Sequence, residues 1–152
     1  MRSFSILFAA LMSATFAGPA SAAGVATYFA AGAPVTSPLT RQVEVLPSGV
    51  RIEHVVQGAG AKPTADNTVT VHYRGTLVAT GAEFDSSYHR GPASFGLRQV
   101  IPCWTEGLQH IAIGGKAVLV CPANTAYGAR GAGRAVPPNS DLRFEVELLN
   151  VR

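Results

Sequence analysis

The stretch "NTVTVHYRGTLV", residues 67–78, alternates polar and apolar residues with a period of two. Val69, Val71 and Tyr73 fall on one face of an extended chain, and the residues between them fall on the other. This pattern is typical of an antiparallel strand with one face on a core and one face in water. We therefore predict a strand here, as the centre of a sheet.

Three further stretches predict strands: "GVRIEHVV" at 49–56, "GGKAVLVCPA" at 114–123 and "DLRFEVELLNV" at 141–151. The last has the clearest alternation, because charged residues separate its apolar ones. We expect its inward side chains to cover the core while its charged side chains meet water. The inward set is Leu142, Phe144, Val146 and Leu148, and the outward set is Arg143, Glu145 and Glu147.

One predicted helix interrupts the strands, in "IPCWTEGLQHIAIGG" at 101–115. Trp104, Leu108 and Ile111 are spaced i, i+4, i+7 and would form a single apolar face. Pro102 suits the first helical turn, and the glycine pair at 114–115 would end the helix. Strands with one helix predict an α+β domain, in which a curved antiparallel sheet packs its concave face on a short helix.

The N-terminal stretch "MRSFSILFAALMSATFAGPASA", residues 1–22, has a basic start, a short apolar run and small residues at its end. This order is typical of a secretory signal peptide, here cleaved between Ala22 and Ala23. An uncleaved membrane anchor is the alternative, but the apolar run is shorter than the roughly 20 residues that span a bilayer. We predict a periplasmic or secreted protein with a flexible tail at 23–46, whose ordered part begins near Val43, and a folded domain at 47–152.

The composition argues against several function classes. The net charge is only +3, and the basic residues do not cluster among aromatic ones as nucleic-acid-binding surfaces require. No later segment is long and apolar enough to enter a membrane. The sequence contains no phosphate-binding loop, nucleophile elbow or metal-ligand motif, and its four histidines lie far apart. We therefore expect no cofactor, no metal, no nucleic acid and no membrane partner.

Cys103 and Cys121 are the only two cysteines in the sequence. An even number of cysteines in an exported protein favours a disulfide. Cys121 lies in an apolar strand, however, so two buried free thiols are the alternative. A disulfide requires the two Cα atoms to lie within about 7 Å of each other, and the fold therefore decides.

Several aromatic residues of the domain lie beside predicted loops rather than inside predicted strands. An apolar cleft lined by aromatic side chains explains this placement, and ordinary core packing is the alternative. For Phe95 we expect core packing. The whole set is Tyr73, Phe84, Phe95, Trp104, Tyr127 and Phe144.

Five segments in order carry a family resemblance: "TVTVHYRGTL", "GAEFDSSYHRG", "VIPCWTEGL", "AYGARGAG" and "VPPNSDLRFEVELL". Together they resemble the FKBP-type peptidyl-prolyl cis-trans isomerases, in particular the secreted bacterial type related to the macrophage infectivity potentiator. The resemblance covers residues 46–152. It implies a half-barrel antiparallel sheet wrapped around one short helix. It also implies an enzyme that assists protein folding by accelerating rotation about X-Pro bonds.

The resemblance further implies which residues form the site. Asp85 is expected to orient the bound peptide at the cleft edge rather than act as an acid, and Ser86 and Ser87 are expected to form a turn. The implied catalytic set is Tyr73, Phe84, Asp85, Trp104, Tyr127 and Phe144. The implied substrate-binding set is Arg90, Val100, Ile101, Ala135 and Val136.

The sequence departs from the family pattern at the cleft rim. Ala93 stands where an aromatic residue is often found, and small residues occupy positions 132 and 135, so a more open rim is expected. Expected partners are proline-containing unfolded polypeptides and FKBP-class macrolide inhibitors. A monomer is expected, because about two dozen residues replace the helical dimerisation arm of larger relatives.

Two other functions compete with this interpretation. One is a module that binds proline-containing segments without useful turnover. The other is a small hydrolase using Asp85 and Ser86, which is weakened by the absence of a histidine near the serine in the sequence.

Overall fold

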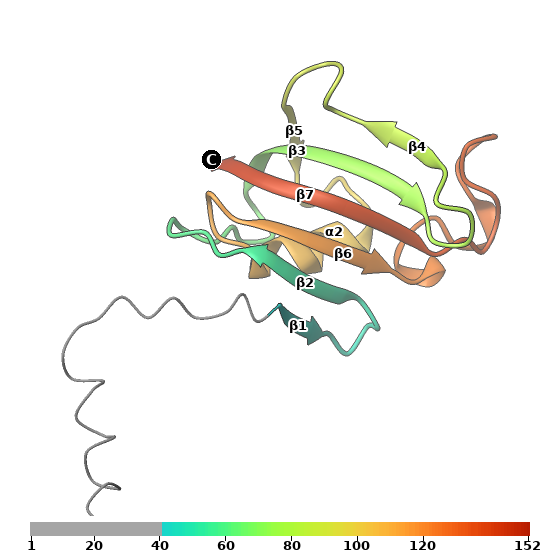
Figure 1. The fold of residues 1–152 in the computed structure, drawn as a ribbon, viewed down its shortest axis with the longest axis horizontal. Coiled ribbons are helices and arrows are strands. Elements are labelled where there is room, and N and C mark those ends of the chain that lie inside the picture. Colours follow the sequence, from blue (N-terminus) through green and yellow to red (C-terminus); the bar gives the residue numbers. More distant parts are fainter. Residues whose placement is uncertain (1–40) are drawn as a thin grey trace, which may run out of the picture. The chain divides into compact units, whose positions relative to one another are not determined.

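The computed structural model describes residues 41–152, and one antiparallel sheet organises them (Figure 1). Its strand order is β1-β2-β6-β7-β3-β4, and β5 pairs with β3 beside this path. Every pairing is antiparallel, as predicted. The strands are β1 (Gln42–Val45), β2 (Arg51–Val56), β3 (Thr68–Leu77), β4 (Glu83–Ser86), β5 (Ala93–Gly96), β6 (Lys116–Cys121) and β7 (Leu142–Val151).

Strands β3 and β7 form the centre of the sheet and confirm the predicted alternation. Tyr73 pairs with Val146, and Val71 pairs with Leu148. The predicted inward residues of both strands are at most 6% exposed. Burying one aliphatic or aromatic side chain of this size contributes about 1.5–3 kcal/mol. The inward faces of β3 and β7 therefore form the middle of the core.

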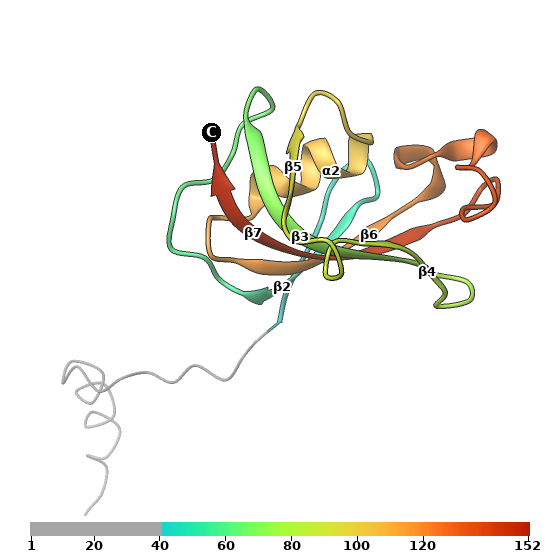
Figure 2. The same cartoon turned by 90° about the horizontal axis from the view of Figure 1, so that it is seen from above.

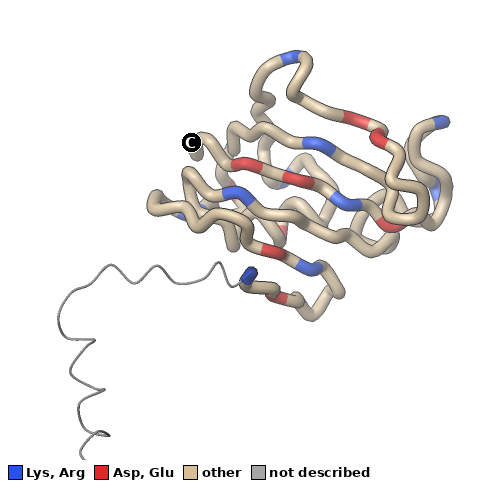
Figure 3. Tube along the Cα trace, viewed as in Figure 1, with Lys and Arg blue, Asp and Glu red and all other residues tan. Residues whose placement is uncertain are grey.

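The outward positions of the same strands carry charged residues of both signs, with Arg143, Glu145 and Glu147 along β7 and Arg74 on β3. Basic and acidic positions along the sheet are marked in Figure 3. Arg143 pairs with Glu145 at 2.6 Å, and Lys116 pairs with Glu147 at 3.1 Å. The hydrogen bond to Glu147 raises the pKa of Lys116. Such partly exposed pairs contribute only about 0–1 kcal/mol each, so they add little to the stability of the sheet.

The predicted helix forms, but it is shorter than the sequence indicated. Helix α2 spans Pro102–Gly107, and the short helix η3 spans Leu108–His110. Together the two helices lie across one face of the sheet (Figure 2), where Trp104 of α2 and Leu108 of η3 are buried. A Cβ atom at Gly107 would lie 3.0 Å from Leu119 Cδ2, so the glycine permits close approach to β6. No helix within residues 41–152 has the length and apolar character needed to cross a bilayer.

Strand β1 extends the sheet into the region predicted as a flexible tail. Gln42–Val45 pairs with β2, and Glu44 also contacts His110 Nδ1 at 3.0 Å. The sheet therefore begins at Gln42, close to the predicted start of order near Val43 and before the domain boundary predicted at Pro47. The predicted signal peptide and the tail up to residue 40 lie outside the described residues.

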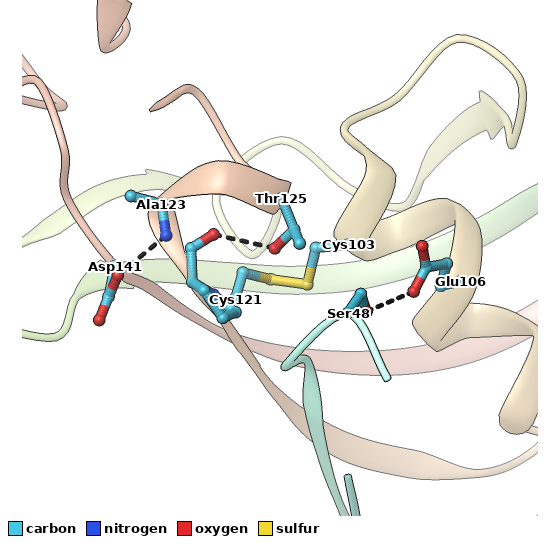
Figure 4. Close-up of a disulfide and its surroundings, with 8 residues drawn as sticks. Ser48, Cys103, Glu106, Cys121, Ala123, Thr125 and Asp141 are labelled. Atoms are coloured by element: carbon cyan, nitrogen blue, oxygen red, sulfur yellow. Dashed lines mark hydrogen bonds between the residues drawn. A yellow bond between two sulfur atoms is a disulfide. The ribbon is translucent and has the colours of Figure 1, made fainter. Parts of the chain in front are cut away.

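The helix is attached to the sheet by a disulfide between Cys103 and Cys121 (Figure 4). The two Cα atoms are 5.7 Å apart, within the range that disulfides require, and both residues are fully buried. The bond joins the first turn of α2 to the last residue of β6. Beside it, Ser48 Oγ donates to Glu106 Oε2 at 2.5 Å. The backbone N–H of Ala123 donates to Asp141 Oδ1 at 2.9 Å. The disulfide thus ties the end of β6 to the helix, and the Ala123–Asp141 bond ties it to the start of β7, while Ser48 joins the β1–β2 turn to the helix.

Candidate functional site: an aromatic cleft over the helix

A cleft of about 380 Å³ opens between the helix and the sheet. Every residue predicted as catalytic lines it, together with the predicted binding residues Val100 and Ile101. The complete lining is Tyr73, Phe84, Asp85, Phe95, Gln99, Val100, Ile101, Trp104, Tyr127 and Phe144. These residues come from β3, β4, β5, α2, β7 and the connecting loops, so the fold gathers them from most of the domain.

Trp104 on α2 is the central residue of the cleft, and it is only 4% exposed. Its ring packs edge-to-face against Tyr73, Phe95 and Phe144, with centroid distances of 5.2, 5.4 and 5.3 Å. Phe84 packs edge-to-face on Phe144 at 5.6 Å. Each such pair contributes about 0.5–1.5 kcal/mol beyond buried area. Within residues 41–152, no hydrogen-bond acceptor takes the Trp104 indole N–H. The edge-to-face contacts, rather than a hydrogen bond from the indole, therefore hold the aromatic walls in one arrangement.

Gly75 lies beneath two of these rings, in the middle of β3. It pairs with Asp85 on one side and Phe144 on the other. A Cβ atom at this position would lie 2.6 Å from Phe84 Cζ and 2.9 Å from Phe144 Cε1. No real Cβ atom approaches its neighbours so closely, so the glycine makes the space in which both rings lie. A glycine inside a strand pattern often marks such close approach, and this signal was present in the sequence.

Asp85 lies at the cleft edge with its carboxylate fully hydrogen-bonded. Tyr73 donates its phenol hydrogen to Oδ2 at 2.6 Å, while Arg90 Nη2 and the Ser86 N–H donate to Oδ1 at 2.5 and 2.9 Å. Burial, followed by the hydrogen bond to Asp85, raises the pKa of Tyr73 to about 12. The phenol therefore stays protonated near neutral pH and keeps donating. This network is suited to orienting groups rather than to releasing a proton.

Three predicted binding residues do not line the cleft. Arg90 lies behind Asp85, where its side chain is 64% exposed. Val136 is 2% exposed, and the backbones of Val136 and Ala132 exchange two hydrogen bonds of 2.9 and 3.2 Å. Ala135 is exposed on the same loop. Here the loop closes on itself through its own backbone, so Ala135 and Val136 lie outside the cleft lining, and their part in binding peptide stays a prediction.

Two lining residues were not predicted as part of the site. Phe95 was expected to be a core residue, and it does pack against the core, but its partly exposed ring also forms a cleft wall. Gln99 is an exposed loop residue that follows β5, and nothing in its sequence surroundings marked it.

The serines after Asp85 act structurally. Ser87 is 1% exposed, and its hydroxyl contacts the Tyr73 N–H at 2.8 Å and His72 Nδ1 at 3.1 Å. Ser86 Oγ accepts from the Tyr88 N–H at 3.2 Å, which is a turn bond. The fold thus brings a histidine to Ser87, but this hydroxyl is too buried to attack a substrate. Residues 41–152 contain no cluster of three or more potential metal ligands.

Comparison with known proteins agrees with this geometry. The profile of the FKBP-type peptidyl-prolyl cis-trans isomerase domain matches residues 60–149. FkpA of Escherichia coli (strain K12), named an FKBP-type peptidyl-prolyl cis-trans isomerase, is 50% identical over 111 residues, which are 72% of this chain and 40% of FkpA. The outer membrane protein MIP of Legionella longbeachae is 44% identical over 111 residues, or 72% of this chain and 47% of MIP.

One solved structure matches along nearly the whole length of its own chain. The crystal structure of a peptidyl-prolyl cis-trans isomerase from Pseudomonas syringae pv. tomato aligns with a TM-score of 0.68 and 38% identity. The alignment covers 89% of this chain and 97% of that one. By contrast, the chain spans about 40% of the length of the FkpA proteins that it matches. The fold, the aromatic cleft and these matches agree, and the chain belongs to the FKBP-type peptidyl-prolyl cis-trans isomerase family.

Proposed function

We propose that this domain catalyses cis-trans isomerisation of X-Pro bonds by binding the prolyl segment in the aromatic cleft. The observation that carries the proposal is the cleft itself: a volume of about 380 Å³ bounded chiefly by aromatic and aliphatic side chains. Its polar groups lie at the edge, and its one carboxylate is already hydrogen-bonded. Such a site is suited to a reaction that needs no nucleophile and no proton transfer.

Isomerisation is such a reaction. The barrier to rotation about an X-Pro bond is roughly 18–20 kcal/mol, because the planar amide has partial double-bond character. The twisted transition state has lost this resonance and carries less charge separation than the planar amide. A dry apolar cleft therefore favours the transition state relative to the ground state more than water does, which is differential binding.

The cleft residues divide between holding the ring and holding the backbone. Trp104 forms the floor under the prolyl ring, and Tyr73 and Phe144 form its walls. The Ile101 carbonyl accepts from the backbone N–H of Trp104 at 2.9 Å, whereas no group within residues 41–152 accepts from the backbone N–H of Ile101. That free N–H and the hydroxyl of Tyr127, a residue that is 40% exposed, are placed to bind peptide groups at the rim.

Asp85→Ala is expected to lower kcat/KM moderately, by roughly three- to tenfold. The substitution removes the group that orients Tyr73 and Arg90, but leaves every apolar wall in place. The exposed pair with Arg90 contributes only about 0–1 kcal/mol to stability, so the fold should remain. The matched control is Glu83→Ala on the same strand, which breaks the exposed pair with Arg74 and should not change the rate. A folded but inactive Asp85→Ala variant would instead assign Asp85 a larger catalytic part.

The function itself is tested by the refolding of a protein whose slow phase is limited by proline isomerisation. We expect the purified chain to accelerate that phase, and an FKBP-class macrolide to suppress the acceleration by competing for the cleft. Absence of acceleration, with binding of proline peptides retained, would favour a binding module that assists folding without turnover.

We further propose that the chain acts outside the cytoplasm, in the periplasm or after secretion, as a monomer. The signal-peptide pattern at residues 1–22 supports export. Its partners would then be unfolded or partly folded exported polypeptides with accessible prolines.

A further inference from the structure

A second hollow, of about 440 Å³, lies beside the aromatic cleft. Unlike the cleft it is polar, because it contains hydroxyls and an exposed ion pair between Arg98 and Asp66. Its lining is Asp66, Thr68, Ser94, Gly96, Leu97, Arg98 and Gln99, and we call it the polar hollow.

Strand β5 separates the polar hollow from the cleft. Successive strand residues point to opposite faces, and accordingly Phe95 lines the cleft while Ser94 and Gly96 line the polar hollow. Gln99, just past the end of this strand, lines both. The two spaces therefore share one lining residue, Gln99. A chain that leaves the cleft over Gln99 and passes around the end of β5 would reach the polar hollow.

Gly96 contributes no side chain to the wall of the polar hollow beside Gln99. A Cβ atom there would meet only Gln99, with the amide Oε1 at 3.6 Å, which is an ordinary contact distance. The φ angle of Gly96 is not positive, so its backbone does not require a glycine. Neither the backbone conformation nor crowding by neighbours requires a glycine at position 96. The effect of the glycine is to leave extra room beside Gln99.

We infer that the polar hollow is a subsite for the polypeptide segment next to the bound proline, an inference that rests on the proposed isomerase function. Arg98 and Asp66 form an ion pair with each other, but both side chains are largely exposed. A guanidinium and a carboxylate each keep hydrogen-bonding capacity beyond one such contact, which suits backbone amides and uncharged polar side chains such as serine and asparagine. An extended chain advances about 3.3 Å per residue, and neighbouring strands lie about 4.8 Å apart. Crossing one strand spacing takes about two residues, so we expect the subsite to receive residues at least about two positions from the proline.

Peptide length is the test. A four-residue proline peptide should fill only the cleft. Two eight-residue peptides are compared with it, one extended with serine and asparagine before the proline and the other after it. The one extended toward the polar hollow should also reach that space. With the unmodified protein we expect KM and the calorimetric Kd to be at least about fivefold lower for one of the two extended peptides than for the short one. Gly96→Val, which fills the space beside Gln99, should abolish this ratio, and Arg98→Ala should reduce it about twofold.

Arg41→Ala is the matched control, since Arg41 also forms an exposed ion pair, with Glu53 on β2, and lines neither space. It should leave the length ratio unchanged. Equal KM and Kd for short and extended peptides would overturn the inference, and so would a ratio that survives in Gly96→Val. If Gly96→Val does not fold, the ratio in the unmodified protein and in Arg98→Ala still decides. Binding without any turnover of the short peptide would count against the proposed isomerase function, while the Kd ratio would still test the subsite.

Discussion

Gly75→Ala is expected to lower kcat/KM on proline peptides by about tenfold or more. The new methyl group would lie 2.6 Å from Phe84 Cζ and 2.9 Å from Phe144 Cε1, so both rings must move. Overpacking of this kind costs about 1–3 kcal/mol of stability, and a tenfold loss in rate corresponds to about 1.4 kcal/mol. Because the displaced rings are cleft walls, we expect activity to fall much more than the folded fraction.

A compensating change and a control separate these effects. Adding Phe84→Leu removes the ring atoms nearest the new methyl group and should restore stability without restoring full activity. Gly114→Ala is the control, because Gly114 has a positive φ and open space around it, so alanine there strains the backbone away from the cleft. If Gly114→Ala and Gly75→Ala lose similar stability and similar activity, the positioning role of Gly75 is wrong. Thermal unfolding and peptide kinetics give both quantities.

Removal of the disulfide is expected to cost about 3 kcal/mol of unfolding free energy. Cys103 and Cys121 are 18 residues apart, and closing a loop of this length restricts the unfolded chain by about that amount. Chemical denaturation of the Cys103→Ala/Cys121→Ala variant, followed by circular dichroism, measures the loss. Alanine avoids placing a polar hydroxyl in these fully buried positions.

Reductant supplies the control for the disulfide. Dithiothreitol should lower the unfolding midpoint of the natural sequence toward that of the double alanine variant, but should not affect the variant itself. Alkylation under denaturing conditions without reductant should leave the mass unchanged. Two alkylated thiols under those conditions would show instead that the cysteines are free in the purified protein.

The sequence predicted the long strands better than the short ones. Alternation over β3 and β7 is sustained for ten residues each, so one buried face is visible in the pattern. Strands β1, β4 and β5 have four residues each, too few to show a period, and they form because a longer neighbour offers backbone partners. The helix is also shorter than predicted, because residues after His110 bond to other segments: Ile113 N–H donates to Ala61 O at 3.0 Å, and Gly114 N–H donates to Leu148 O at 2.8 Å.

The lining of the cleft was also predicted only in part from the sequence. Aromatic residues in family segments predicted its walls, but Phe95 looked like a core residue because a wall of a shallow cleft is also the surface of the core. Gln99 lines the cleft through loop geometry, which no local pattern encodes. In the other direction, Ala135 and Val136 were carried over by position, whereas the backbone bonds of their own loop decide where they lie.

The placement of the disulfide has a spectroscopic consequence. Trp104 is the only tryptophan of the chain, and its covalent neighbour Cys103 is one half of the disulfide. A disulfide near an excited indole accepts an electron from it and quenches its emission. The oxidised protein should therefore fluoresce weakly and brighten on reduction, and a ligand resting on the indole should alter the same signal. One emission band would then report both the oxidation state of the protein and the occupancy of its cleft.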